Sequence, residues 1–118
     1  MALDGNDVVF AASGDDVVCA GDGDDSVFGG DGDDLIFGQR GNDYLEGAKG
    51  RDIIFGQRGN DDIYGNAQFL LTDQYVDPVA DALFGGRGSD ILVGTDGDDI
   101  LKGGIGLGWA RTTLLVIW

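Results

Sequence analysis

The sequence predicts an all-β solenoid of nine-residue repeats, and three observations support this fold class. The chain aligns at a period of nine residues from Ala2 to Tyr64 without a gap, and the period returns at residues 85–102. Its 118 residues include 23 glycines and one proline, which suits many backbone positions at positive φ better than it suits helices. Each repeat also has a nearly constant Gly at its fourth position, Asp at its sixth and an aliphatic residue at its eighth.

The repeat units can be written in register along the chain. Units one to seven are ALDGNDVVF, AASGDDVVC, AGDGDDSVF, GGDGDDLIF, GQRGNDYLE, GAKGRDIIF and GQRGNDDIY. Unit eight begins at Gly65, is interrupted by an insertion at residues 67–80, and resumes at Asp81, so that it exceeds the period by 11 residues. Units nine and ten, GGRGSDILV and GTDGDDILK, are complete, whereas the next unit, GGIGLGWAR, lacks the aspartate. We therefore expect one array over residues 2–102, with a degenerate repeat and an apolar C-terminal tail over 103–118.

The charged residues point to a cation as the partner. Of the 22 acidic residues only Glu46 is not Asp, and Asp is the carboxylate that suits tight turns and cation ligation. The formal net charge of −15 argues against nucleic acid and anionic membranes as partners. With no His and one Cys, the chain lacks the residues for a zinc site, for Ser-His or Cys-His catalysis, or for an internal disulfide. Calcium remains as the cation that oxygen ligands alone would bind.

Catalysis and membrane insertion are not expected. Paired carboxylates such as Asp15 and Asp16 lie in repeated turns, so we interpret them as members of ladders and not as an acid–base pair. No apolar run reaches the length of a membrane span, and no signal-peptide core follows Met1. Export, if it occurs, is expected to use another signal.

The units resemble the RTX (repeats-in-toxin) consensus G-G-x-G-x-D-x-U-x, the hemolysin-type calcium-binding nonapeptide repeat. This resemblance implies a right-handed parallel β-roll, a two-sheet β-solenoid in which six residues of each unit form a turn and three form a short strand. Successive strands would join two facing sheets alternately. The resemblance also implies a secreted, extracellular protein, and the apolar tail is loosely similar to the uncleaved signals of type I secretion. A capping strand, or sequence not native to the module, would explain the tail equally well.

In such a roll, the eighth position fills the space between the sheets, because the middle side chain of a three-residue strand points opposite to its neighbours. The predicted core is Val9, Val18, Val27, Ile36, Leu45, Ile54, Ile63, Leu83, Leu92 and Leu101.

Calcium is expected between stacked turns. Carboxylates about 5 Å apart repel by about 3 kcal/mol at an effective dielectric of 20, and a hard cation removes this repulsion. The ligands would come from the sixth-position aspartates and from turn carbonyls at the fourth-position glycines. These candidate residues are Asp7, Asp16, Asp25, Asp34, Asp43, Asp52, Asp61, Asp90, Asp99, Gly5, Gly14, Gly23, Gly32, Gly41, Gly50, Gly59, Gly88 and Gly97. An EF-hand is disfavoured because its loop ends in Glu, and Glu46 is the only Glu present.

About six to eight Ca²⁺ ions are expected, and about seven would nearly neutralise the charge of −15. Regular sites are expected between the turns of units one, three, five, seven and nine, and between those of two, four and six. The insertion should leave calcium missing or altered beside Asp81, so Asp43→Ala should raise the calcium midpoint much more than Asp81→Ala.

Outward strand positions divide into two faces by the parity of the unit. The odd face is mixed and contains Val8, Phe10, Ser26, Phe28, Tyr44, Glu46, Asp62, Tyr64, Ile91 and Val93. The even face is apolar at nine of ten positions and contains Val17, Cys19, Leu35, Phe37, Ile53, Phe55, Ala82, Phe84, Ile100 and Lys102. We expect a second copy, the parent protein, the tail or the inserted loop to cover the even face. The third position holds Asp22 and Asp31 early in the array but Arg40, Lys49, Arg58 and Arg87 later, as solvated charges or as substitutes for metal charge.

These patterns favour a calcium-binding module that is largely unfolded at micromolar calcium and folds when it binds calcium. The alternative is an accessory C-terminal domain of a secreted enzyme, such as a protease, lipase or epimerase, or of an adhesin.

Overall fold

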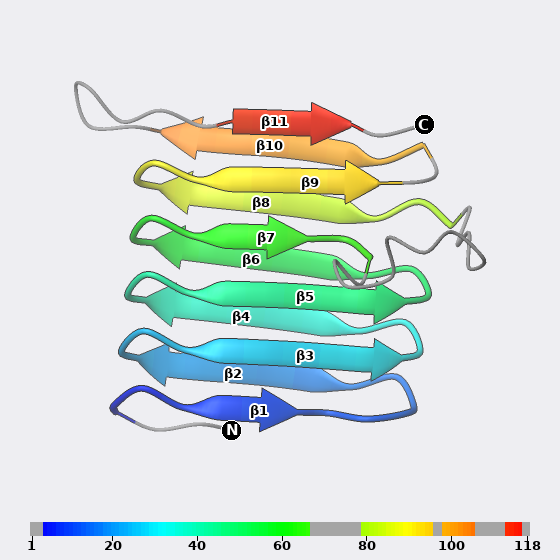
Figure 1. The fold of residues 1–118 in the computed structure, drawn as a ribbon, viewed down its shortest axis with the longest axis horizontal. Helices are drawn as coiled ribbons and strands as arrows, with labels where there is room; N and C mark the ends of the chain where they lie inside the picture. Colours follow the sequence, from blue (N-terminus) through cyan, green and yellow to red (C-terminus); the bar gives the residue numbers. More distant parts are fainter. Residues whose placement is uncertain (1–3, 67–78, 96–97, 106–112, 117–118) are drawn as a thin grey trace.

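The chain winds as a parallel β-solenoid in a computed structural model that describes residues 4–66, 79–95, 98–105 and 113–116 (Figure 1). Successive strands alternate between two sheets, with orders β1-β3-β5-β7-β9-β11 and β10-β8-β6-β4-β2. The strands are β1 (Val8–Phe10), β2 (Val17–Asp22), β3 (Ser26–Asp31), β4 (Leu35–Arg40), β5 (Tyr44–Lys49), β6 (Ile53–Arg58), β7 (Asp62–Tyr64), β8 (Ala82–Arg87), β9 (Ile91–Thr95), β10 (Ile100–Ile105) and β11 (Thr113–Val116). The predicted fold class is confirmed. Within the described ranges, the structure has no helix with the length and apolarity needed to cross a membrane.

Most strands are longer than the three residues that the family resemblance implies. Strands β2 to β6 have six residues each and run from the seventh position of one unit to the third position of the next. Parallel pairing continues there, for example between Gly21 and Gln39 and between Asp22 and Arg40. The turn proper is therefore only the fourth to sixth positions, and this short turn determines how the functional side chains stack.

The core is the predicted row of aliphatic side chains. From Val27 to Leu92 the eighth-position side chains are fully buried, whereas Val9 and Leu101 near the ends of the roll are partly buried. Because the eighth position alone brings a large apolar side chain from each unit to the interior, the two sheets pack through a single file of large side chains. The array therefore has a thin core, and contacts between its turns must contribute much of what specifies the fold.

Left-handed backbone occurs at two positions of each unit. The fourth-position glycines have φ between +116° and +135°, and a Cβ on Gly23 would collide with the carbonyl of Gly5 in the preceding turn of the stack. Unexpectedly, the second position is also left-handed and holds non-glycine residues, with φ from +77° to +82° at Ala12, Gln39, Ala48 and Gln57. A non-glycine residue in this region costs roughly 1–2 kcal/mol. Inter-turn hydrogen bonds, such as that from the Asp31 N–H to the Ala12 carbonyl at 2.8 Å, hold the strained position.

The insertion leaves the register of the roll unchanged. Ile54 pairs with Leu83 across β6 and β8, and Ile63 pairs with Leu92 across β7 and β9. Residues 67–78 lie outside the described part of the chain. The enlarged unit therefore keeps its place in the array, and the eighth strand falls in the even sheet as its unit number requires.

The C-terminal part extends both sheets. Strand β10 continues to Ile105, beyond the expected end of the array at residue 102, and pairs with β8. Strand β11 pairs in parallel with β9, with an irregularity between Leu115 and Val116. This segment of the tail thus forms a further strand of the odd sheet and does not lie across the even face.

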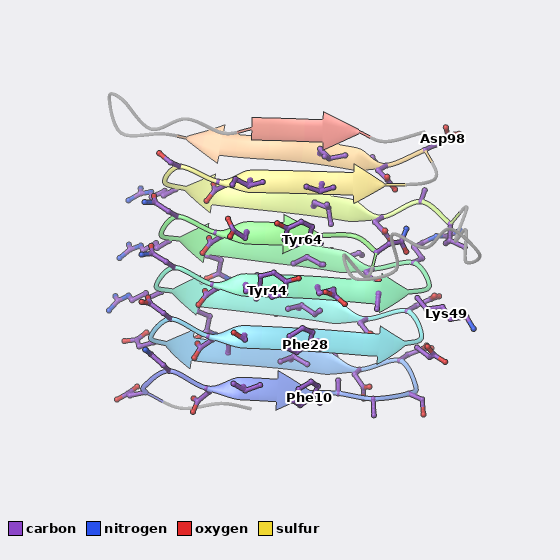
Figure 2. The ribbon with its side chains drawn as sticks, in the orientation of Figure 1. Phe10, Phe28, Tyr44, Lys49, Tyr64 and Asp98 are labelled. Atoms are coloured by element: carbon purple, nitrogen blue, oxygen red, sulfur yellow. The ribbon has the colours of Figure 1, made fainter. Side chains whose placement is uncertain are left out.

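Aromatic columns run along the outside of both sheets. On the even face, the ring centroids of Phe37 and Phe55 are 5.2 Å apart and those of Phe55 and Phe84 are 4.8 Å apart. On the odd face, Phe10, Phe28, Tyr44 and Tyr64 lie one above another across the strands (Figure 2).

Glu46 interrupts the odd column, yet only 6% of it is exposed, so it is buried although its position faces outward. The Tyr44 hydroxyl donates to its Oε2 at 2.9 Å, and burial together with this bond raises the pKa of Tyr44. The odd face is therefore less polar than its sequence indicates.

Candidate metal centres in the stacked turns

The turns form two columns at opposite edges of the roll (Figure 1). Turns of odd-numbered units, at residues 5–7, 23–25, 41–43, 59–61 and 88–90, follow strands of the even sheet and stack on one edge. Turns of even-numbered units, at residues 14–16, 32–34 and 50–52, stack on the other edge, and the column continues to Asp81. Residues that are 18 apart in sequence therefore become direct neighbours.

The sixth-position aspartates form one hydrogen-bonded ladder in each column. In each case, one carboxylate oxygen, Oδ1, accepts the main-chain N–H of the aspartate in the preceding turn. The Asp25 N–H donates to Asp43 at 2.9 Å, and the Asp43 N–H donates to Asp61 at 2.9 Å. The same bonds link Asp7 to Asp25 and Asp61 to Asp90 in the odd column, and Asp16, Asp34, Asp52, Asp81 and Asp99 in the even column.

The second carboxylate oxygen of these side chains faces the interior of the turn stack. Oδ2 is buried and accepts no hydrogen bond in Asp16, Asp25, Asp34, Asp43, Asp61 and Asp90. A buried carboxylate oxygen without a donor is costly, and its usual compensation is a hydrogen bond or a metal ion. Six such oxygens in equivalent positions therefore indicate a repeated ligand.

A main-chain carbonyl lies beside this oxygen in four of these residues, Asp34, Asp43, Asp61 and Asp90. A Cβ placed on Gly38 would lie 2.5 Å from Asp43 Oδ2 and 2.9 Å from the Gly56 carbonyl oxygen. At Gly29 the corresponding distances are 2.5 Å to Asp34 Oδ2 and 2.7 Å to the Gly47 carbonyl oxygen. Carboxylate and carbonyl oxygens thus converge on a space that only glycine at the first position keeps open.

The first-position glycines are site residues that the sequence analysis missed. Their signal was present, because every unit from the fourth to the tenth begins with Gly. Units two and three begin with Ala11 and Ala20 instead. Since Ala20 is fully buried, the space beside the carboxylate is narrower in that unit.

A second ladder, at the fifth position, was also missed. Here the side-chain oxygen of one turn accepts the main-chain N–H of the following turn, the reverse of the direction at the sixth position. Asp15 Oδ1 accepts from Asp33, and Asn42 Oδ1 accepts from Asn60 at 2.8 Å. The signal was the run of Asn and Asp at this position, which Arg51 interrupts in the turn next to the insertion.

Burial and like charge make these carboxylates hard to ionise without a cation. Burial raises the pKa of Asp43 to about 6 and that of Asp61 to about 7, and neighbouring carboxylates of the column add to the increase. Their hydrogen bonds from main-chain N–H groups oppose these shifts in part. Burial also raises the pKa of Asp34 and Asp90.

The donor set fits calcium. Calcium accepts six to eight oxygen ligands, including carboxylates and main-chain carbonyls, in flexible geometry. Among the described residues, no group of three or more acidic, His or Cys side chains gathers at one point. Each site would therefore combine few carboxylates with several carbonyls, as stacked turns provide. The candidate aspartates and glycines lie in these two columns, except that Gly97 is outside the described residues.

Asp81 is regular at its carboxylate despite the insertion. Its Oδ1 accepts the Asp52 N–H at 2.8 Å, and its own N–H donates to Asp99 at 2.9 Å. Gly65, at the first position of the same unit, lies against its Oδ2, as Gly38 lies against Asp43. The insertion therefore does not displace this carboxylate.

We now predict that Asp81→Ala and Asp43→Ala raise the calcium midpoint by similar factors, each less than about tenfold, because the two carboxylates have the same ladder bonds and the same neighbouring first-position glycine. Calcium titrations of both variants, followed by circular dichroism, test this. A shift at Asp43→Ala alone would show that the inserted unit does not bind the ion.

A parallel β-solenoid whose turns stack buried carboxylate and carbonyl oxygens is a metal-binding repeat array. Comparison with protein families matches four copies of the RTX calcium-binding nonapeptide repeat, at residues 1–27, 20–45, 37–69 and 78–107. These copies span most of the sequence, and the chain belongs to the RTX calcium-binding nonapeptide repeat family. No curated protein and no solved structure matched the chain.

Proposed function

We propose that this chain is a calcium-responsive folding module of a secreted protein, ordered by about six to eight Ca²⁺ ions between its turns. The observation that supports this most is the buried, unpartnered Oδ2 in each column, as at Asp25 in the odd column and Asp34 in the even column. Without a cation these oxygens oppose folding, whereas with calcium they become ligands. Millimolar calcium outside the cell would favour the folded form, and low calcium inside would keep the chain extended for export.

A calcium titration tests the proposal. In excess chelator we expect a substantial part of the β-sheet signal in circular dichroism to be absent, and we expect that part to appear between about 0.1 mM and a few mM calcium. Magnesium should act poorly, because it requires a smaller octahedral shell and keeps its waters. Full β-structure in chelator, or equal midpoints for the two ions, would contradict the proposal.

The parent protein is proposed to be a secreted enzyme or adhesin that carries the roll as an accessory domain, since the array is a structural calcium-binding unit. Its contact surface would be the even face, which has no acidic side chain at its outward seventh and ninth positions. Val17, Ile53 and Ile100 on this face are 67%, 40% and 54% exposed. The rings of the Phe37, Phe55 and Phe84 column are partly covered by one another.

We predict that the calcium-loaded chain self-associates through the even face. This association should be abolished in the triple variant Phe37→Ser, Phe55→Ser, Phe84→Ser. A second triple variant, Val17→Thr, Ile53→Thr, Ile100→Thr, should weaken the association while leaving the column of phenylalanine rings intact. Light scattering with and without calcium measures both effects, and Val8→Thr, Ile91→Thr on the odd face is the control. A monomeric parent at high concentration would exclude association through this face.

A further inference from the structure

The charge of the turns changes abruptly between units four and five. Units three and four carry Asp at the third, fifth and sixth positions, whereas units five, six, seven and nine keep only the sixth-position Asp and carry Arg or Lys at the third. Residues 4–37, the acidic zone, contain ten Asp and no Lys or Arg. Residues 38–64 with 81–93, the mixed zone, contain seven acidic and five basic residues. The turns thus pass from strongly negative to nearly neutral within one stack.

The structure places these charges in register. Asp22, Arg40, Arg58 and Arg87 occupy successive rungs at the edge of the odd-unit turns. At the boundary between the zones, Arg40 Nη1 lies 3.8 Å from Asp22 Oδ2. On the opposite edge, Lys49 follows Asp31 on the next rung (Figure 2). Each basic residue therefore lies at the edge of a turn stack, three residues before the sixth-position aspartate of its own unit.

The fifth-position ladder loses its charge at the same boundary without losing its hydrogen bonds. In the acidic zone its acceptors are the amide of Asn6 and then carboxylates, as in the 2.9 Å bond from the Asp33 N–H to Asp15. In the mixed zone they are amides: the Asn60 N–H donates to Asn42, and the Ser89 N–H donates to Asn60, both at 2.8 Å. The turn geometry is therefore the same in both zones, and the difference between them is electrostatic.

We propose that the calcium dependence of this fold resides in the acidic zone, and that Arg40, Lys49, Arg58 and Arg87 act as built-in counterions in the mixed zone. This inference rests on the proposed function. In the acidic zone, the stacked carboxylates have no basic side chain among them except Arg40 beside Asp22 at the boundary, so order requires bound calcium. In the mixed zone the turns are nearly neutral without metal, and a divalent ion gains less by binding there. Because each repeat contacts only its neighbours, the two zones can respond separately.

Hydrogen–deuterium exchange of the full chain, read by peptide in chelator and in 10 mM calcium, tests the inference. Calcium should raise protection about 100-fold or more in residues 4–37 and less than about tenfold in residues 38–64 and 81–93. Similar increases in both zones would overturn the inference while leaving the proposed function standing. No increase in either zone would instead overturn the proposed function.

A graded set of variants separates the counterion role from a general structural role. Changing Arg40, Arg58 and Arg87 together to Gln, and then together to Asp, should progressively reduce protection of the mixed zone in chelator. In the Asp variant, 10 mM calcium should restore protection to the parent level, which a merely misfolded variant would not show. Lys102→Asp, outside both zones, is the control for a change of charge alone. Unchanged protection in chelator for the Asp variant would contradict the counterion role.

Discussion

The variant Asp16→Asn, Asp25→Asn, Asp34→Asn is expected to be more ordered than the parent in chelator and to gain little from calcium. At Asp25 and Asp34, Asn keeps the oxygen that accepts the inter-turn N–H. It replaces the buried, unpartnered Oδ2 with an NH₂ group that cannot ligate a cation. The change therefore removes a buried negative charge and a metal ligand together. Loss of the charge should stabilise the fold in chelator, whereas loss of the ligand should reduce the stabilisation that calcium provides.

The fifth-position variant Asp15→Asn, Asp24→Asn, Asp33→Asn is the matched control. It changes the same turns by the same charge and keeps the ladder acceptors, but it leaves the Oδ2 ligands in place. Its calcium response should be retained. Thermal unfolding with and without calcium measures all three proteins, and an undiminished calcium response in the sixth-position variant would show that Oδ2 is not a ligand.

Mild acid is expected to replace calcium in part. The pKa of Asp43 is raised to about 6 and that of Asp61 to about 7 by burial, from an ordinary value of 3.8. A carboxyl group whose pKa is higher in the folded chain than in the unfolded chain binds its proton more tightly when the chain is folded. The stability of the metal-free roll should therefore be greatest below pH 4 for these groups and should fall as the pH rises to about 7.

We predict that the metal-free chain gains β-structure between pH 8 and pH 5, and that calcium affinity falls over the same interval because protons compete for the ligands. Circular dichroism in chelator and calorimetric titration at each pH measure the two trends. Light scattering at each pH separates folding from aggregation near the isoelectric point, which is about 4.1. Loss of structure on acidification would contradict the assignment of these carboxyls to buried sites.

The features that could be predicted from the sequence are those that lie within one repeat. The aliphatic row from Val27 to Leu92, the left-handed glycines such as Gly41, and the parity of the two faces follow from the period and from side-chain alternation. Each depends on a residue type that is nearly invariant at its position, so the signal is repeated along the whole array.

The features that could not be predicted arise between repeats. The six-residue strands and the left-handed Gln39 and Gln57 depend on hydrogen bonds to turns 18 or more residues away, and these outweigh local preference. The convergence of Asp43 Oδ2 and the Gly56 carbonyl likewise exists only in the stack. The regular position of the Asp81 carboxylate could not be predicted from the length of the insertion, because ladder bonds to Asp52 and Asp99 hold it.

The alternation of strands between two sheets restricts how such an array can change in length. Direct neighbours in a column are separated by 18 residues, or by 29 where the insertion adds 11. Loss of a single nine-residue unit would move every later strand to the opposite sheet. Phe55 and Phe84 would then join the sheet of Glu46, and the arginine row would move to the edge that now carries Lys49.

Gain or loss of two units preserves both faces, and so does extra length confined to a turn, as at residues 67–80. Repeat arrays of this architecture are therefore expected to diverge in steps of two units, and to accept additional sequence where a turn can bulge outward without changing the count of strands.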